Sequence, residues 1–446
     1  MKLKVSNADE RGLELLWASR EGDEERVRLL ISQNTSTKTA DDRGLTALHL
    51  ACKSGNIAIA DLLFGKGADI DAKSPAGDSP LACASGEGHT SVVKVLLEHG
   101  ANPDIGAGSE YLPLACASRG GYTSVVKVLL EHGANPDIGA GSDYLPLACA
   151  SRGGHTSVVK VLLEHGANPD IGAGSDYLPL ACASRGGYTS VVKVLLEHGA
   201  NPDIGKNSWS SPLACASQNG HTSVVKVLLE HGANPDIGKN SWSSPLACAS
   251  QNGHTSVVKV LLEHGANPDI GKNSWSSPLA CASQNGHTSV VKVLLEHGAD
   301  PNLKNSSSSA LCSASENEII PIMKLLLDHG AGVDGSNSWL SPLEFAAENG
   351  KLEGVKILLD HGADLKGRRE GPLYYAVKMK HFDVVKLLLD RGANPLAISD
   401  SRTVFSVYRR KSCGTSEQIL QLLEEAHSKN LVRDGTNSPP NFHRDG

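Results

Sequence analysis

The chain has 446 residues, with 46 Gly, 21 Pro and 18 His, but only 4% aromatic and 40% hydrophobic residues. One compact globule of this length would carry more large core side chains, so the composition favours many small, similar units. Basic residues number 42 and acidic residues 49, giving a net charge of −7. This balance excludes a global positive field that would hold nucleic acid or an anionic membrane surface.

The first segment, residues 1–12, lacks the apolar core of a signal peptide, and nowhere do 18 apolar residues run together. We therefore expect neither secretion nor insertion into a membrane. The expected compartment is the cytoplasm, with the nucleus as the second option.

A repeat of 33 residues organises the chain. The string VVKVLLEHGA recurs with its Gly at positions 100, 133, 166, 199, 232, 265 and 298. Weaker copies precede the series at Asn34 and Gly67 and follow it at Gly330, Gly362 and Gly392. The chain therefore holds about twelve units.

Each unit is expected to form a helix, a turn, a second helix and a projecting finger. In residues 142–174, Pro146 suits the first position of a short helix that Gly153 and Gly154 end. Thr156 is the predicted N-cap of an amphipathic second helix, which Gly166 closes. The following Asn-Pro-Asp and Gly-Ala-Gly-Ser residues cannot continue a helix and predict a turn and a hairpin-like finger.

Such short helices are not stable alone, so the units must stack on their neighbours. The two ends then need polar caps. Charged residues surround Leu29 and Leu30 in the first unit and Leu422 and Leu423 in the last, as a cap requires. The segment after Ala426 is polar and contains Pro, and we expect it to be disordered.

One unit carries the clearest family resemblance. Residues 44–51 read GLTALHLA and are followed by Gly55, by Leu62-Leu63 and by Gly67-Ala68-Asp69. With the 33-residue period, this pattern resembles the ankyrin repeat signature over roughly residues 9–426. The resemblance implies an all-α ankyrin-repeat solenoid of helix-turn-helix units with β-hairpin fingers. It also implies recognition of proteins rather than catalysis, and no cofactor.

The expected division of the chain follows the period. It comprises an N-terminal segment (1–8), an N-terminal capping repeat (9–42), single repeats (43–75 and 76–108), three near-identical repeats of a Tyr/Arg type (109–207), three of a Trp/Lys type (208–305), single repeats (306–337, 338–369 and 370–398), a C-terminal capping repeat (399–426) and a disordered tail (427–446).

The chain also departs from the signature. Only His49 keeps the signature histidine, and Ala stands at the equivalent place in the seven following units. The residue before the helix-starting Pro is Ser at 79, 211, 244 and 277, which can cap the helix, but Leu at 112, 145 and 178, which cannot. A lost cap costs about 1 kcal/mol, so we expect residues 109–207 to be less stable than residues 208–305.

The near-identical units place aromatic residues on the fingers and cationic residues beside them. Trp, Tyr and Arg are the residue types that dominate binding energy at protein interfaces. The predicted partner-binding residues are Tyr111, Tyr144, Tyr177, Arg119, Arg152, Arg185, Lys206, Trp209, Lys239, Trp242, Lys272 and Trp275. Trp339 is a candidate extension of the Trp/Lys set. By the resemblance, partners dock on the concave face formed by fingers and first helices.

Three interpretations of function stay open. The first is a monomeric, non-enzymatic scaffold for protein partners, including extended or repetitive ones that could engage several units at once. The second is a substrate-recruiting adaptor subunit of a ubiquitin-ligase-type assembly. The third treats the repetition as neutral duplication, in which each aromatic ring only packs on the next finger.

Repeated Cys and His residues are expected to be structural. Seven cysteines from Cys83 to Cys281 share one place in the first helix, and helices packed ~8 to 10 Å apart exceed the ~4.4 to 6.8 Å Cα window of a disulfide. We expect buried thiols there and surface thiols at Cys52, Cys312 and Cys413. Seven helix-ending histidines, from His99 to His297, are too far apart to share a metal ion and suit the helix dipole instead.

Overall fold

The structure is a computed structural model of the 446-residue chain. It describes residues 7–106, 110–139, 144–172, 177–205, 211–238, 244–271, 277–303, 309–335, 339–395, 398–399, 402–403 and 417–433. The chain forms two compact units, residues 1–237 and 238–446, and the boundary falls in the finger of the repeat 208–240. Each unit is described by itself below.

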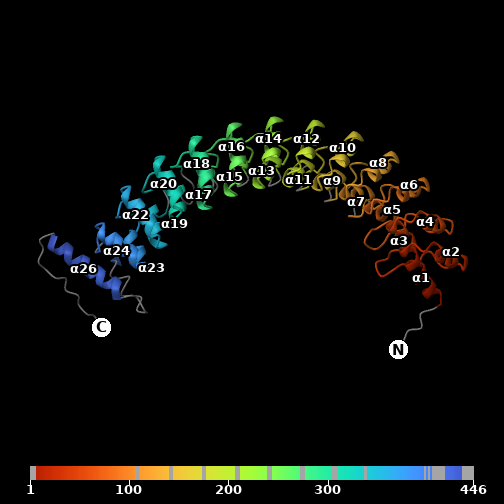
Figure 1. Ribbon diagram of the computed structural model, residues 1–446, viewed down its shortest axis with the longest axis horizontal. Helices are drawn as coiled ribbons and strands as arrows, with labels where there is room; N and C mark the ends of the chain where they lie inside the picture. Colours follow the sequence, from red (N-terminus) through yellow and green to blue (C-terminus); the bar gives the residue numbers. More distant parts are fainter. Residues whose placement is uncertain are drawn as a thin grey trace, which may run out of the picture. The chain divides into compact units, whose positions relative to one another are not determined.

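Unit 1 consists of helix pairs, each contributing a first and a second helix (Figure 1). The first helices are α1 (Asn7–Glu21), α3 (Ala47–Ser54), α5 (Pro80–Gly86), α7 (Pro113–Gly120), α9 (Pro146–Arg152), α11 (Pro179–Gly186) and α13 (Pro212–Gln218). The second helices are α2 (Glu24–Ser32), α4 (Ile57–Phe64), α6 (Thr90–Glu98), α8 (Thr123–Glu131), α10 (Thr156–Glu164), α12 (Thr189–Glu197) and α14 (Thr222–Glu230).

Unit 2 continues the same pattern. Its first helices are α15 (Pro245–Gln251), α17 (Pro278–Gln284), α19 (Ala310–Glu316), α21 (Pro342–Glu348) and α23 (Pro372–Met379). Its second helices are α16 (Thr255–Glu263), α18 (Thr288–Glu296), α20 (Ile320–Asp328), α22 (Leu352–Asp360) and α24 (Phe382–Asp390). Two short strands and a last helix follow, β1 (Ile398–Ser399), β2 (Arg402–Thr403) and α26 (Glu417–Arg433).

The helix boundaries follow from Pro and Gly. Pro146 is the first residue of α9, where its missing N–H leaves no intrahelical bond unmade. Gly166 follows α10 with φ +86°, a left-handed conformation that side chains resist. The predicted N-cap is displaced by one residue, because α10 begins at Thr156 and His155 occupies the cap without a side-chain bond.

Within unit 1 each first helix packs on the first helix of the next repeat, and the second helices form a parallel row. The space between the rows is filled by small and branched residues. Leu114 and Ala117 from α7 and Val125 and Leu129 from α8 are fully buried or nearly so. This all-α repeat fold matches the expected architecture.

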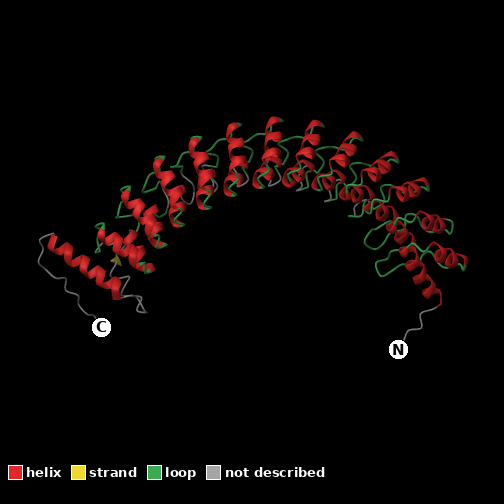
Figure 2. Ribbon diagram, in the orientation of Figure 1, coloured by secondary structure: helices red, strands yellow, loops and turns green. Residues whose placement is uncertain are grey.

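The expected β-hairpin fingers are described only in part, because the tips of most of them, from residues 107–109 to 336–338, lie outside the described residues. In the described part of the chain, the connections contain turns and loops (Figure 2), with two exceptions. One is an isolated bridge between Ala40 and Thr46, and the other is the antiparallel pair of β1 and β2.

The expected difference in helix capping is also wrong in part. Ser79 and Ser277 accept the N–H of Ala82 and Ala280, but Ser211 and Ser244 make no such cap bond. The Leu residues at the same position, including Leu112 and Leu145, are instead fully buried. In the Tyr/Arg repeats a buried Leu side chain, here called the apolar anchor, therefore stands where a capping side chain would otherwise be.

The two ends require two corrections. Helix α26 runs to Arg433, so the expected tail boundary at residue 427 falls inside a helix, and residues 434–446 lie outside the described part. At the other end α1 begins at Asn7 rather than residue 9. Arg26 pairs with Glu14 as a polar cap requires, but Leu13 and Trp17 on α1 are more than half exposed.

Candidate interaction surface

The three tyrosines of the Tyr/Arg repeats lie just before the first helices of their repeats. In each repeat the next residue is a buried Leu and the one after it is the Pro that begins the helix. This order fixes the backbone beside the ring. Tyr111, Tyr144 and Tyr177 are half-buried.

The three arginines occupy the last turn of α7, α9 and α11, and all three are exposed. The Cζ atom of Arg119 lies 5.7 Å from the centroid of the Tyr144 ring. The Cζ atom of Arg152 lies 4.8 Å from that of Tyr177. Each stack joins the arginine of one repeat to the tyrosine of the next, which the sequence did not reveal.

The cysteines lie beneath these stacks. Burial raises the pKa of Cys149 and Cys182, while Arg119 and Arg152 beside them act in the opposite direction. Arg185 has no tyrosine at the corresponding place in the next repeat and donates to Cys215 Sγ at 3.7 Å. Burial raises the pKa of Cys116 to about 11, so these thiols stay protonated at neutral pH and are poor nucleophiles.

The six predicted site residues of the Trp/Lys repeats lie outside the described residues. They are Lys206, Trp209, Lys239, Trp242, Lys272 and Trp275. Trp339 shares their sequence context, Asn-Ser-Trp, and it is described.

All nine cysteines in the described part of the chain are free. The repeated thiols are buried or half-buried, as expected. The expectation of surface thiols is wrong for Cys52 and Cys312, which are both buried in first helices. Cys413 lies outside the described residues.

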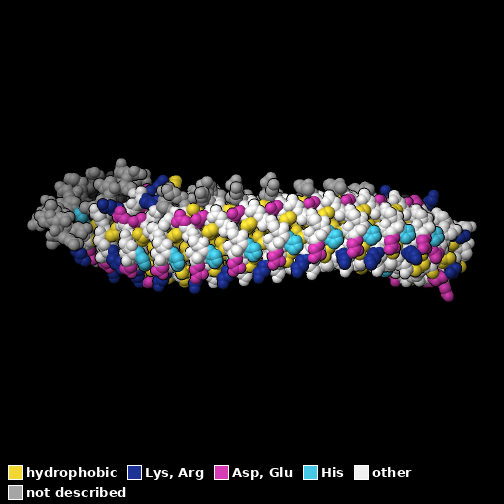
Figure 3. All heavy atoms as spheres, turned by 90° about the horizontal axis from the view of Figure 1, so that it is seen from above, with side chains coloured by type: hydrophobic (Ala, Val, Ile, Leu, Met, Phe, Trp, Pro, Cys, Tyr) yellow, Lys and Arg dark blue, Asp and Glu magenta, His cyan; other side chains and the backbone are white. Residues whose placement is uncertain are grey.

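Histidines serve two structural roles. Those that end second helices, such as His99 and His165, donate from Nδ1 to the carbonyl four residues earlier at 2.8–2.9 Å. Figure 3 shows histidine side chains as separate patches on the surface. Among the described residues, no three His, Cys, Asp or Glu side chains are grouped so as to hold one metal ion.

A second set of histidines begins second helices and joins neighbouring repeats. His155 Nε2 donates to the carbonyl of Arg119 at 3.0 Å, and His89 reaches Lys53 in the same way. This bond between repeats is not evident from the sequence. The one hint in the sequence is that the position of His155 in the unit also holds a ring-bearing residue in the repeats on either side, Tyr122 and Tyr188.

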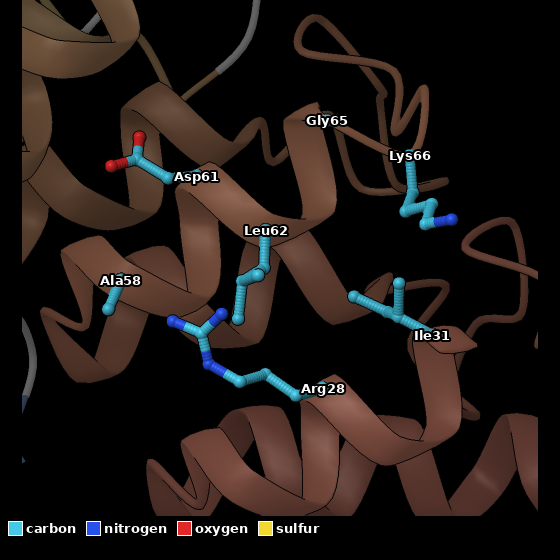
Figure 4. A pocket seen from close by; sticks show the side chains of 7 residues that line it. All are labelled: Arg28, Ile31, Ala58, Asp61, Leu62, Gly65 and Lys66. Atoms are coloured by element: carbon cyan, nitrogen blue, oxygen red, sulfur yellow. The ribbon is translucent and has the colours of Figure 1, made fainter.

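A shallow groove lies between α2 and α4, away from the predicted residues (Figure 4). The residues that line it are Arg28, Ile31, Ala58, Asp61, Leu62, Gly65 and Lys66. Arg28 extends toward Leu62 and pairs with Glu24 of its own helix. None of the predicted partner-binding residues contributes to this groove.

A family model described as ankyrin repeats in three copies matches residues 7–74, 66–140, 114–208, 147–241, 213–305, 279–369 and 311–398. These overlapping matches span most of the chain. The chain belongs to the ankyrin repeat family.

Individual relatives match only short parts of this ankyrin repeat protein. Ankyrin repeat domain-containing protein 63 from Homo sapiens is 42% identical over 55 residues, which are 12% of this chain and 14% of the relative. Protein phosphatase 1 regulatory subunit 27 from Homo sapiens is 41% identical over 59 residues, 13% of this chain and 38% of the relative. The matches thus cover well under half of either relative.

Among solved structures, the crystal structure of the human ASB11 ankyrin repeat domain matches with 29% identity and a TM-score of 0.44. The match covers 50% of this chain and 98% of that domain. In the described part of this ankyrin repeat protein, no helix is both long and apolar enough to cross a bilayer.

Proposed function

We propose that this ankyrin repeat protein is a non-enzymatic scaffold that binds partner proteins on the face formed by its fingers and first helices. Membership of the family supports protein recognition. One relative is named as a regulatory subunit of a phosphatase, which accords with a non-catalytic role for the matched segment.

The repeated Arg-on-Tyr stack carries this proposal. Arg119 with Tyr144 and Arg152 with Tyr177 repeat one arrangement along unit 1. Stacking restrains both side chains before a partner arrives, so less conformational entropy is lost on binding. Each pair offers an aromatic edge for apolar contact and a guanidinium for hydrogen bonds, the combination found in interface hot spots.

The stacks bear directly on the interpretation in which each ring only packs on the next finger. The tyrosines do contact a neighbouring repeat, but through an exposed arginine rather than through another buried ring. A purely structural contact would not require an exposed cation. We extend the proposal to Tyr111, to Arg185 and to the Trp/Lys residues named above, and we propose a monomer.

The proposed compartment is the cytoplasm or the nucleus. Nine free cysteines in the described part of the chain are typical of a reducing compartment. The net charge of −7 supports protein rather than nucleic acid as the ligand.

Affinity pull-down from a cell extract with the full chain tests the proposal. The triple variant Arg119→Ala, Arg152→Ala, Arg185→Ala should lose specific partners that the wild type retains, with helix content unchanged. A matched control is Lys127→Ala, Lys160→Ala, Lys193→Ala on the second helices of the same three repeats. Identical partner sets for the wild type and both triple variants would contradict the proposed surface.

A deletion separates this function from the adaptor role. Removal of residues 403–446 should leave the partners of the Arg/Tyr surface bound, because that surface lies in unit 1. Selective loss of a co-purified ubiquitin ligase from the deleted chain would instead indicate the adaptor.

A further inference from the structure

Trp339 and Arg369 form an aromatic and cationic platform in unit 2. The Cζ atom of Arg369 lies 3.6 Å from the centroid of the Trp339 ring. Trp339 nevertheless stays 67% exposed, more than any other described large hydrophobic residue. Arg369 is also exposed. A large ring is thus held against one cation while much of its surface faces solvent.

A buried carboxylate holds this platform in place. Glu344, in the first turn of α21, is fully buried. Its Oε1 accepts the backbone N–H groups of Arg368 at 3.1 Å, Arg369 at 3.0 Å and Gly371 at 3.2 Å. Its Oε2 accepts the N–H of Ser341 at 2.7 Å. Glu344 therefore ties the finger that carries Arg369 to the residues that follow Trp339.

The surroundings of the platform are basic although the chain as a whole is acidic. Residues 366–380 hold five basic residues and one acidic residue. The acidic residue, Glu370, accepts the hydroxyl of Tyr375, and the Nζ of Lys378 lies 5.6 Å from the centroid of the same tyrosine ring. Lys366 and Arg368 are exposed on the same finger as Arg369, and Lys378 is exposed on α23. The Nη2 of Arg368 donates to the carbonyl of Gly335. The patch therefore presents positive charge and one aromatic ring to solvent.

We propose that this patch, formed by Trp339, Lys366, Arg368, Arg369 and Lys378, binds an acidic linear peptide. Carboxylate or phosphate groups of the peptide would pair with the guanidinium groups, which suit planar anions. An apolar side chain of the peptide would rest on the exposed surface of the Trp339 ring. Charge complementarity favours this ligand, because four of the five patch residues are exposed cations.

This inference rests on the proposed function in one respect, that the chain recognises polypeptides, and adds a second surface with its own ligand chemistry. The two surfaces share no residue. The two stacked arginines of the Tyr/Arg repeats, Arg119 and Arg152, therefore provide an independent arm of the test.

Fluorescence anisotropy on the full chain tests the proposal with three labelled synthetic peptides. All three share the same flexible, Gly-containing sequence with a single Leu and differ only in their charged residues. The first carries several Glu, the second phosphoserine in place of Glu, and the third Lys. The wild type should bind an acidic peptide and not the Lys peptide, and the ratio of the two acidic affinities identifies the favoured anion. Trp339→Ala and Arg369→Glu should each weaken binding by about tenfold.

Lys324→Glu is the matched control, since it makes the same charge change on an exposed residue of α20 in unit 2. It should change the affinity by less than about twofold. Circular dichroism checks that each variant keeps its helix content. If Arg369→Glu does not, Arg369→Gln replaces it, with a smaller expected loss and with Lys324→Gln as the matched control.

Three results would overturn the inference. They are failure of both acidic peptides to bind the wild type, equal weakening by Lys324→Glu and Arg369→Glu, and loss of binding in the double variant Arg119→Glu, Arg152→Glu with none in Arg369→Glu. The last would leave the scaffold function intact and assign acidic ligands to the Tyr/Arg repeats.

Discussion

At the residue scale, leucines replace helix caps in the Tyr/Arg repeats. Leu112 is fully buried and packs in one cluster with Ala115 of its own helix and Ile138 of the following turn. Burying a leucine side chain contributes roughly 1.5–3 kcal/mol, which exceeds the roughly 1 kcal/mol of a cap. The structure thus removes the reason to expect lower stability in residues 109–207.

Leu112→Ala should strongly lower the free energy of local unfolding of α7. We expect a cost of about 2–5 kcal/mol, because the substitution leaves a cavity between two turns of the chain. Hydrogen exchange of peptides that cover α7 measures this cost.

Two serines at the same position of the unit provide reference values for the cost of Leu112→Ala. Ser277→Ala, which removes a real cap bond, should cost about 1 kcal/mol, and Ser244→Ala, which removes none, should cost less than about 0.5 kcal/mol. A smaller effect for Leu112→Ala than for Ser277→Ala would contradict the apolar-anchor account.

His49 is predicted to make the stability of its repeat depend on pH. Burial lowers its pKa, and its Nδ1 accepts the N–H of Thr46 at 3.1 Å while its Nε2 donates to the Asp78 carbonyl at 3.2 Å. The folded state therefore favours the neutral ring. As the pH falls below the unfolded value of about 6.5 toward the lowered folded pKa, the unfolded state binds more protons and stability is lost.

Hydrogen exchange of α3 between neutral and mildly acidic pH should show this loss after correction for the intrinsic exchange rate. His49→Gln keeps a polar side chain but cannot titrate, so its profile should be flatter over the same range. Parallel profiles for the two proteins would exclude His49 as the titrating group.

At the element scale, rings at the start of second helices pack closely on glycines of the preceding repeat. Gly121 has φ +74°, and a Cβ placed there would lie 2.6 Å from Nδ1 of His155 in the next repeat. Position 121 therefore requires glycine for two reasons. Its backbone is left-handed, and the His155 ring leaves no space for a Cβ. Tyr122 rests on Gly88 in the same way.

Gly121→Ala should cost more than Gly133→Ala. Both glycines are left-handed, so either substitution carries a backbone strain of about 1–2 kcal/mol. Nothing lies within 4 Å of a Cβ at Gly133, whereas Gly121→Ala displaces the His155 ring and adds roughly 1–3 kcal/mol. Chemical denaturation of both variants gives the comparison, and equal midpoints would show that the ring moves aside freely.

The sequence predicts the structural features that are determined within one repeat, and it does not predict those that depend on contacts between repeats. Pro146 and Gly166 mark the ends of helices by local backbone rules, so both ends were predicted to within a residue. The bond from His155 to Arg119 and the stack of Arg152 on Tyr177 depend on how repeats are aligned. Periodicity alone does not determine that alignment.

At the scale of the whole molecule, neighbouring repeats are also joined along their turns. The carboxylate of Asp104 accepts the N–H of Asn135 at 3.0 Å, and Asp137 accepts that of Asn168 at the same distance. Both the helix packing and the turn contacts between one repeat and the next therefore recur along the chain. Stability should then be close to a sum of repeat and nearest-neighbour contributions.

Deletion of residues 142–174 tests this additivity. The repeat that then follows residue 141 begins with the same sequence, so the new junction reproduces the old one apart from Tyr188 in place of His155. The shortened chain should fold, with helix content and denaturant m-value reduced in proportion to its length. Loss of cooperative unfolding would show that the repeats depend on more than their neighbours.

The Arg-on-Tyr stacks have a further consequence for a partner that needs only one of them. On the surface we propose, such a partner would find two alternative sites, Arg119 with Tyr144 and Arg152 with Tyr177, and a twofold multiplicity would lower the free energy of binding by about 0.4 kcal/mol. It can also shift from one site to the other by a step of one repeat. The bound state is then a set of interchangeable registers, and a point substitution in one repeat redistributes the partner instead of releasing it.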